Sequence, residues 1–112
     1  MTDTRFAGKI GLITGAASGI GRATALALVR QGGTLVAVDR DADGLDKLSS
    51  ELDDGHRMIA ADVTDEDRWR EIAEEVGDAY GRLDILFNNA GYGNFASIAE
   101  TSLDQWLSLI HI

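Results

Sequence analysis

A glycine-rich segment between an apolar run and a helical pattern constrains this chain more than any other feature. The octapeptide T-G-A-A-S-G-I-G begins at Thr14, the last residue of the strand-like run Lys9–Thr14. Gly15 allows a tight turn, Gly19 lets backbone approach a pyrophosphate, and Gly21 lets the next helix pack closely on the strand. The N-terminus of that helix offers unpaired N–H groups and a positive dipole end to phosphate. The motif predicts a dinucleotide site, the alternative being a turn built from permissive glycines.

Apolar runs and helical patterns alternate along the rest of the chain. Further strands are expected at Thr34–Val38, His56–Ala61 and Leu83–Phe87. Helices are expected over Gly19–Gln31, from Asp41 to about Leu52, from Thr64 to about Tyr80, and after Ser102. The order βαβαβαβ plus a helix predicts an α/β fold, with parallel strands, right-handed crossovers and helices on both faces of the sheet.

Periodicity and capping residues predict finer details of these helices. The third helix is expected to begin at Thr64, with Asp67 completing something close to a capping box, and to end at Gly81. The first helix is expected to present one face made of Ile20, Ala23, Thr24, Ala27 and Leu28.

An acidic residue at the end of the second strand indicates which cofactor is preferred. Asp39 lies 24 residues after Gly15, where a carboxylate can accept both adenosine ribose hydroxyls and would repel a 2′-phosphate. The adjacent Arg40 could instead bind that phosphate, but no basic residue lies inside the glycine loop. We therefore expect NAD rather than NADP. The alternative for Asp39 is a helix N-cap, which Asp41 could supply instead.

The charge balance and the absence of cysteine exclude several classes of function. Ten basic against 19 acidic side chains give a formal charge of −9, which argues against nucleic acid or an anionic membrane as a partner. No apolar stretch is long enough to cross a bilayer. Without cysteine, disulfides, Cys-ligated zinc and thiol catalysis are excluded, and no metal site is predicted. We expect a cytoplasmic protein.

Three segments, in order and on the expected elements, resemble the classical short-chain dehydrogenases/reductases. Thr14–Gly21 is similar to the family's T-G-x-x-x-G-I/L-G cofactor motif, and Asn88–Gly91 reads N-N-A-G directly after the fourth strand, as in the family. Asp62-Val63 resembles the pair that contacts adenine. The resemblance implies a Rossmann-like doubly wound parallel sheet, truncated to strand order 3-2-1-4 of the family's 3-2-1-4-5-6-7.

The resemblance also implies a set of cofactor contacts. The glycine loop would lie along the pyrophosphate, Asp39 would hold the adenosine ribose, and Asp62 would accept from the adenine amino group. Asn89 and its neighbours would lie near the nicotinamide ribose, and Asn88 would mainly brace the sheet. Asp62 could instead be a polar strand-end residue, and the two asparagines only turn formers. The implied cofactor-binding residues are Gly15, Ser18, Gly19, Ile20, Gly21, Asp39, Arg40, Asp62, Val63, Asn89, Ala90 and Gly91.

The chain departs from the family pattern at the catalytic residues. The family's Ser and Tyr-x-x-x-Lys are absent, because Tyr80 is followed four positions later by Asp84 and Tyr92 by Ala96. No catalytic residue is therefore assigned. We expect residues 1–112 to be the N-terminal part of a single NAD(P)-binding domain that ends within a helix, and to be inactive alone. The parent protein is expected to be a homo-oligomeric enzyme that transfers hydride between nicotinamide and an alcohol or ketone.

Two other functions fit parts of the sequence. A non-catalytic dinucleotide-binding module would use the same glycine loop without a proton donor. A methyltransferase that binds S-adenosylmethionine would also pair a glycine loop with an acidic strand end, although the N-N-A-G segment after Phe87 argues against it.

Overall fold

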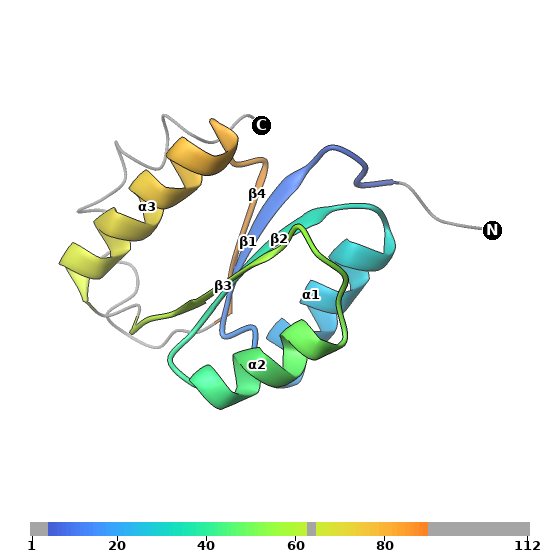
Figure 1. Cartoon of the computed structure of the whole chain (residues 1–112), viewed down its shortest axis with the longest axis horizontal. Coiled ribbons are helices and arrows are strands. Elements are labelled where there is room, and N and C mark those ends of the chain that lie inside the picture. The colour runs from blue at the N-terminus through green and yellow to red at the C-terminus, as the bar shows by residue number, and fades with distance from the viewer. Residues whose placement is uncertain (1–4, 63–64, 90–112) are drawn as a thin grey trace.

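The computed structural model describes residues 5–62 and 65–89 of the 112-residue chain. Strands and helices alternate over these residues, as the sequence predicts (Figure 1). Most boundaries lie within two residues of the predicted ones. The expected helix after Ser102 lies outside the described residues. The elements are β1 (Ile10–Thr14), α1 (Gly19–Arg30), β2 (Thr34–Asp39), α2 (Ala42–Ser50), β3 (Arg57–Ala60), α3 (Glu66–Tyr80) and β4 (Ile85–Asn88).

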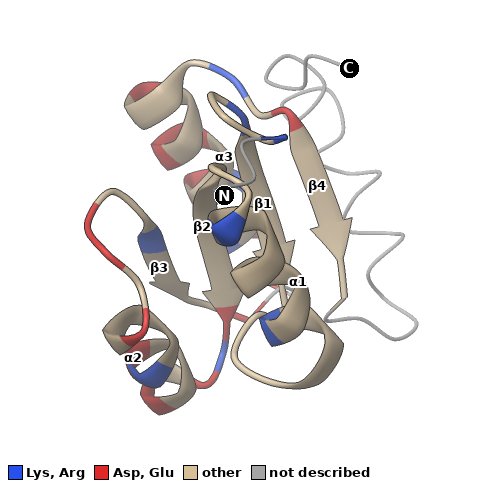
Figure 2. Ribbon diagram, turned by 90° about the vertical axis from the view of Figure 1, so that its right-hand side faces the viewer, with Lys and Arg blue, Asp and Glu red and all other residues tan. Residues whose placement is uncertain are grey.

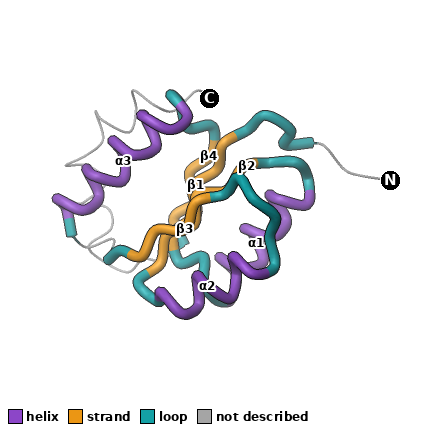
Figure 3. The backbone as a smooth tube through the Cα atoms, viewed as in Figure 1, coloured by secondary structure: helices purple, strands orange, loops and turns teal. Residues whose placement is uncertain are grey.

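The four strands form one parallel sheet in the order β3-β2-β1-β4. Helices α1 and α2 cover one face of this sheet and α3 covers the other (Figures 1 and 3). The chain first builds outward from β1 to β3 and then crosses to the other side of β1 to form β4. This reversal leaves a switch point at the carboxyl ends of β1 and β4, where doubly wound folds bind their ligands. The predicted fold class and strand order are confirmed.

Alternating side chains on the central strands supply two separate cores. Leu12 and Val36 point toward α3, whereas Ile13 and Leu35 point toward α1 and α2, and all four are almost fully buried. A strand covered on both faces must be apolar at every position, which explains the unalternating runs in the sequence.

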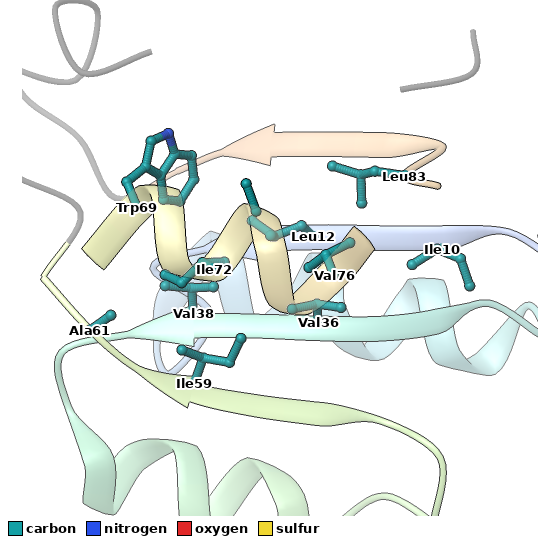
Figure 4. Close-up of a cluster of buried hydrophobic side chains, with 11 residues drawn as sticks. Ile10, Leu12, Val36, Val38, Ile59, Ala61, Trp69, Ile72, Val76 and Leu83 are labelled. Atoms are coloured by element: carbon teal, nitrogen blue, oxygen red, sulfur yellow. The ribbon is translucent and has the colours of Figure 1, made fainter. Parts of the chain in front are cut away.

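Helix α3 closes its face of the sheet with one apolar stripe. Trp69, Ile72 and Val76 are each at most 1% exposed and lie over the strands (Figure 4). Burying a side chain of this size contributes roughly 1.5–3 kcal/mol. The stripe therefore accounts for much of the attachment of α3. The opposite face of α3 is charged and carries ion pairs, such as the one between Arg68 and Glu71 at 3.2 Å.

The predicted inward face of α1 is confirmed at Leu28 and wrong nearer the N-terminal end of the helix. The buried positions are Gly21, Ala25 and Leu28, whereas Ile20 is 71% exposed. The prediction followed apolar side chains, but α1 approaches the sheet through its smallest residues at its N-terminal end. Close approach of the helix backbone at Gly21 turns Ile20 outward.

The predicted start of α3 also needs correction. Asp65, rather than Thr64, is the N-cap, and its carboxylate accepts from the Arg68 N–H at 3.1 Å. Asp and Thr both cap helices, and Asp is the stronger of the two. The predicted end is confirmed, since Gly81 takes a left-handed conformation with φ +73°. Thr64 lies outside the described residues.

Asp84 joins the start of β4 to the start of β1, a role that the sequence did not indicate. Its buried carboxylate accepts from the Ile10 N–H at 2.8 Å and from Arg82 Nε at 3.0 Å. Burial alone would raise the pKa of Asp84. The Ile10 N–H, the Arg82 guanidinium and the charge on Lys9 outweigh burial and hold this pKa below its ordinary value. The Asp84 N–H in turn donates to the Ile10 carbonyl.

Candidate functional site

The predicted site residues that the structure describes gather at the carboxyl edge of the sheet, on both sides of the switch point. The glycine loop follows β1, Asp39 ends β2, Asp62 follows β3 and Asn89 follows β4. Parallel strands bring their carboxyl ends to one edge, so residues distant in sequence become neighbours there. An N–H of Ala61 that donates to the Asp39 carbonyl at 3.0 Å holds the end of β3 beside β2.

The glycines of the loop are required by its conformation and its packing. Gly15 and Gly19 have φ of +65° and +58°, a left-handed region that side chains other than glycine rarely adopt. A Cβ added to Gly21 would lie 2.1 Å from the Gly15 carbonyl oxygen and 2.7 Å from Asn89 Nδ2. The loop therefore folds back on the first turn of α1, with no room for a side chain between them.

The N-terminus of α1 differs from those of the other described helices. Its N-cap, Ser18, makes no side-chain capping hydrogen bond, and its first turn contains no acidic residue. In α2 and α3, by contrast, an aspartate caps the helix and the first turn carries further acidic residues. In Figure 2 the ribbon is coloured red, for Asp and Glu, on α2 and α3 but not along α1. This helix end keeps N–H groups and a positive dipole end available to an anion.

The Asp39 carboxylate is half-buried and already oriented by backbone. Oδ2 accepts from the Ala17 N–H in the glycine loop at 2.9 Å, and Oδ1 accepts from the Asp41 N–H at 2.9 Å. An ionised carboxylate has about four acceptor positions, so about two remain. They match the two hydroxyls of a ribose. The helix cap of α2 is Asp41, which accepts from the Gly44 N–H at 3.0 Å. The N-cap alternative for Asp39 is therefore wrong.

Asn89 connects the end of β4 to the loop after β1. Its N–H donates to the Oγ1 of buried Thr14 at 3.0 Å, and its Nδ2 donates to the Gly15 carbonyl at 3.4 Å. Asn88, which was expected to brace the sheet, is exposed but pairs with Thr14 in the ladder between β1 and β4. Asn89 adds the two hydrogen bonds to the end of β1 and its loop. Sequence reasoning also missed Thr14, although its place as the last polar residue of a buried strand was a signal.

The remaining predicted residues surround this centre or lie beyond the described part of the chain. Arg40 and Asp62 are exposed. Arg40 directly follows Asp39, and Asp62 follows Ala61, whose N–H donates to the Asp39 carbonyl. Exposed Ile20 projects from the first turn of α1. The other three predicted cofactor-binding residues lie outside the described residues, namely Val63, Ala90 and Gly91.

Two hollows lie at the opposite end of the sheet from the glycine loop. They have volumes of about 290 and 250 Å³ and share Val29 and Asp53 among their lining residues. They open near the amino ends of β2 and β3, the end at which doubly wound sheets do not usually bind ligands. The described residues contain neither a group of side chains suited to hold a metal ion nor a helix able to span a membrane.

Comparison with known proteins identifies relatives along almost the whole chain. A family model described as short chain dehydrogenase matches residues 9–112. D-threitol dehydrogenase of Mycolicibacterium smegmatis is 43% identical over 98% of this chain and 44% of its own length. The 3-oxoacyl-(acyl-carrier-protein) reductase FabG of Thermotoga maritima is 39% identical over 96% of this chain and 45% of its own length.

Solved structures agree with these relatives. The crystal structure of a 3-ketoacyl-(acyl-carrier-protein) reductase from Brucella melitensis, complexed with NADH, superposes with a TM-score of 0.72. It is 31% identical, and the match covers 92% of this chain and 47% of that one. The chain therefore spans less than half the length of these proteins. The family match decides against the methyltransferase alternative.

Proposed function

Because the chain belongs to the short-chain dehydrogenase family, we propose that it forms the adenosine- and pyrophosphate-binding part of an NAD(P)-dependent oxidoreductase. The observation that carries this proposal is the Ala17–Asp39 hydrogen bond of 2.9 Å, which joins the glycine loop to the Asp39 carboxylate. Next to this bond, the N-cap of α1, Ser18, makes no side-chain capping hydrogen bond. The proposed phosphate-binding loop and the proposed ribose-binding carboxylate are thus joined by a direct hydrogen bond.

Each group at the switch point has a distinct proposed role. Backbone N–H groups of residues 18–21, at the N-terminus of α1, bind the pyrophosphate. The glycines at positions 19 and 21 let the phosphates approach this backbone closely. The two unused acceptor positions of Asp39 bind the adenosine ribose hydroxyls, and Asp62 accepts from adenine. Asn89, with Ala90 and Gly91, lies toward the nicotinamide ribose. When bound, the nicotinamide supplies the group that accepts or donates hydride.

NAD is the proposed cofactor in preference to NADP. A 2′-phosphate would have to sit against the Asp39 carboxylate, whose remaining acceptor positions suit hydroxyl donors and repel an anion. Two more acidic residues follow closely, because Asp41 is the N-cap of α2 and Asp43 lies in its first turn. Arg40 is the only basic residue between Asp39 and Asp46, and it contributes to the adenosine pocket without outweighing these three carboxylates.

The whole protein's chemistry is proposed on family grounds. We propose a homo-oligomeric enzyme in which these residues form the first part of one NAD(P)-binding domain, and in which hydride passes between nicotinamide and an alcohol or ketone. This chain carries no Tyr-x-x-x-Lys, so we propose that it binds the cofactor without turning over substrate. The cytoplasmic location expected from the sequence stays a prediction.

Calorimetric titration of the chain with NAD⁺ and NADP⁺ tests the proposal. Asp39→Asn leaves one acceptor oxygen for two backbone N–H groups and removes the charge, so NAD⁺ affinity should fall at least about tenfold. Asp54→Asn removes the same charge at an exposed position far from the glycine loop and serves as the matched control. Equal NAD⁺ affinity in the two variants, or tighter binding of NADP⁺ than of NAD⁺ by the unmodified chain, would contradict the proposed roles of Asp39.

A further inference from the structure

Four residues form a closed ring of contacts beside the glycine loop. The Ala17 N–H donates to Asp39 Oδ2 at 2.9 Å, and the Asp41 N–H donates to Asp39 Oδ1 at 2.9 Å. Asp41 Oδ1 then accepts from the Gly44 N–H at 3.0 Å. The ring closes where α2 returns to the loop, because Gly44 packs directly against Ala17. The same carboxylate proposed to bind ribose is one member of this ring.

The contact between Gly44 and Ala17 leaves no room for a side chain. A Cβ added to Gly44 would lie 2.7 Å from the Ala17 Cβ, closer than real Cβ atoms approach. The Ala17 Cβ is fixed to its backbone and cannot rotate away. The Asp41 Oδ2 atom, also at 2.7 Å, is the far end of a side chain and can shift. Apart from proline, glycine is the poorest helix former, so its place in the first turn of α2 has a reason in packing.

We propose that Gly44 and Asp41 are positioning residues of the dinucleotide site, which hold the glycine loop and the Asp39 carboxylate in their binding geometry before the cofactor arrives. This inference rests on the proposed function. Gly44 sets how closely α2 approaches the loop, and Asp41 fixes the first turn of α2 to Asp39. Ala17 cannot move without breaking its hydrogen bond to Asp39, so the loop and the carboxylate are oriented together.

Such an arrangement lowers the cost of binding, because the loop is ordered before the ligand is present. It also predicts that a change in α2, outside any contact with the pyrophosphate, weakens cofactor binding. Gly44→Ala should displace Ala17, break the Ala17–Asp39 hydrogen bond and reduce NAD⁺ affinity by about tenfold, the effect expected for losing one hydrogen bond to a carboxylate.

A rescue experiment separates positioning from simple stability. The chain, its Gly44→Ala variant, its Ala17→Gly variant and the double variant are titrated with NAD⁺ and melted without it. Ala17→Gly removes the Cβ that the new methyl group meets, so the double variant should bind within about twofold of Ala17→Gly alone, a strong coupling for residues in contact. Ser49→Ala, at an exposed position of α2, should bind as the unmodified chain does. The amide of Ala17 should be protected from hydrogen exchange in the unmodified chain and lose protection in Gly44→Ala.

The outcomes distinguish a positioning role of Gly44 from a merely structural one, and both from failure of the proposed function. If the unmodified chain binds NAD⁺ and Gly44→Ala binds equally well, the positioning role is wrong while the proposed function stands. If Gly44→Ala loses affinity only in proportion to a loss of melting temperature, and the double variant recovers neither, Gly44 is merely structural and the inference is wrong. If the unmodified chain does not bind NAD⁺ or ADP-ribose, the proposed function fails and the inference falls with it.

Discussion

Replacing Gly21 with alanine tests whether close packing of α1 on the glycine loop holds this edge of the sheet together. The new Cβ would lie 2.1 Å from the Gly15 carbonyl oxygen, more than 1 Å short of ordinary van der Waals contact, which begins at 3.4 Å. It would also lie 2.7 Å from Asn89 Nδ2 and from the Gly15 carbonyl carbon. Two of these three atoms are backbone, so a side-chain rotation cannot relieve the clash.

Two effects of opposite sign set the size of the change. Alanine is a better helix former than glycine by up to about 1 kcal/mol, which favours the variant. Overpacking usually costs about 1–3 kcal/mol, and a clash with backbone belongs at the upper end of that range. We therefore expect Gly21→Ala to lower the free energy of unfolding by roughly 2 kcal/mol. The displaced groups, Gly15 and Asn89, both belong to the proposed dinucleotide site, so NAD⁺ affinity should fall as well.

Urea unfolding followed by circular dichroism measures the change in the free energy of unfolding. Ala27→Gly, at an exposed position of α1, measures helix propensity in the same helix without a clash and should cost about 1 kcal/mol. The sign of the Gly21→Ala effect is decisive. A variant as stable as the unmodified chain, or more stable, would show that propensity outweighs packing at this position and that our reading of the loop is wrong.

Three further predictions concern hydrogen bonds away from the glycines. Thr14→Val keeps the shape of a buried side chain but leaves the Asn89 N–H without its acceptor, so unfolding experiments should show a loss of about 1–3 kcal/mol. Asp84, whose pKa is lowered in the folded state, contributes stability above the unfolded pKa of about 3.9 that is lost as pH falls through the folded pKa. The stability gap between the unmodified chain and Asp84→Asn should therefore be constant near neutral pH and shrink as pH falls below the ordinary aspartate range, and a gap independent of pH would count against the role of Asp84. Asp65→Ala removes the cap of α3, so the free energy of unfolding measured by urea titration should fall by about 1 kcal/mol. An unchanged urea midpoint would show that Asp65 does not stabilise the start of α3.

Much of the fold was predictable because the signals for its elements are local. A strand covered on both faces must be apolar throughout, and the run at β2 (Thr34–Asp39) has this character. The helix ends were marked by residues with special conformations, such as Gly81. The face of α1 was not predictable in the same way, because the helix is oriented by the backbone contact at Gly21 and not by its largest apolar side chains.

In the candidate site too, local features were predictable and contacts between distant residues were not. The glycine loop and Asp39 could be named from the sequence, because a glycine-rich turn followed by an acidic strand end is the local pattern of an NAD-binding βαβ unit. Their hydrogen-bond partners could not be named. The Ala17–Asp39 bond and the contact of Gly44 with Ala17 arise only when α2 folds back against the loop after β1.

The sequence by itself determined the order of the elements, the conformation of the glycine loop and the charge at the end of β2, since each of these depends on residues within one turn or one strand of each other. The tertiary structure alone decided that the Asn89 N–H donates to the Thr14 hydroxyl across a separation of 75 residues. It also decided that Gly44 of α2 packs against Ala17 of the glycine loop. Such contacts depend on which strands are neighbours in the sheet and how closely a helix approaches it, and no local pattern of residues records either quantity.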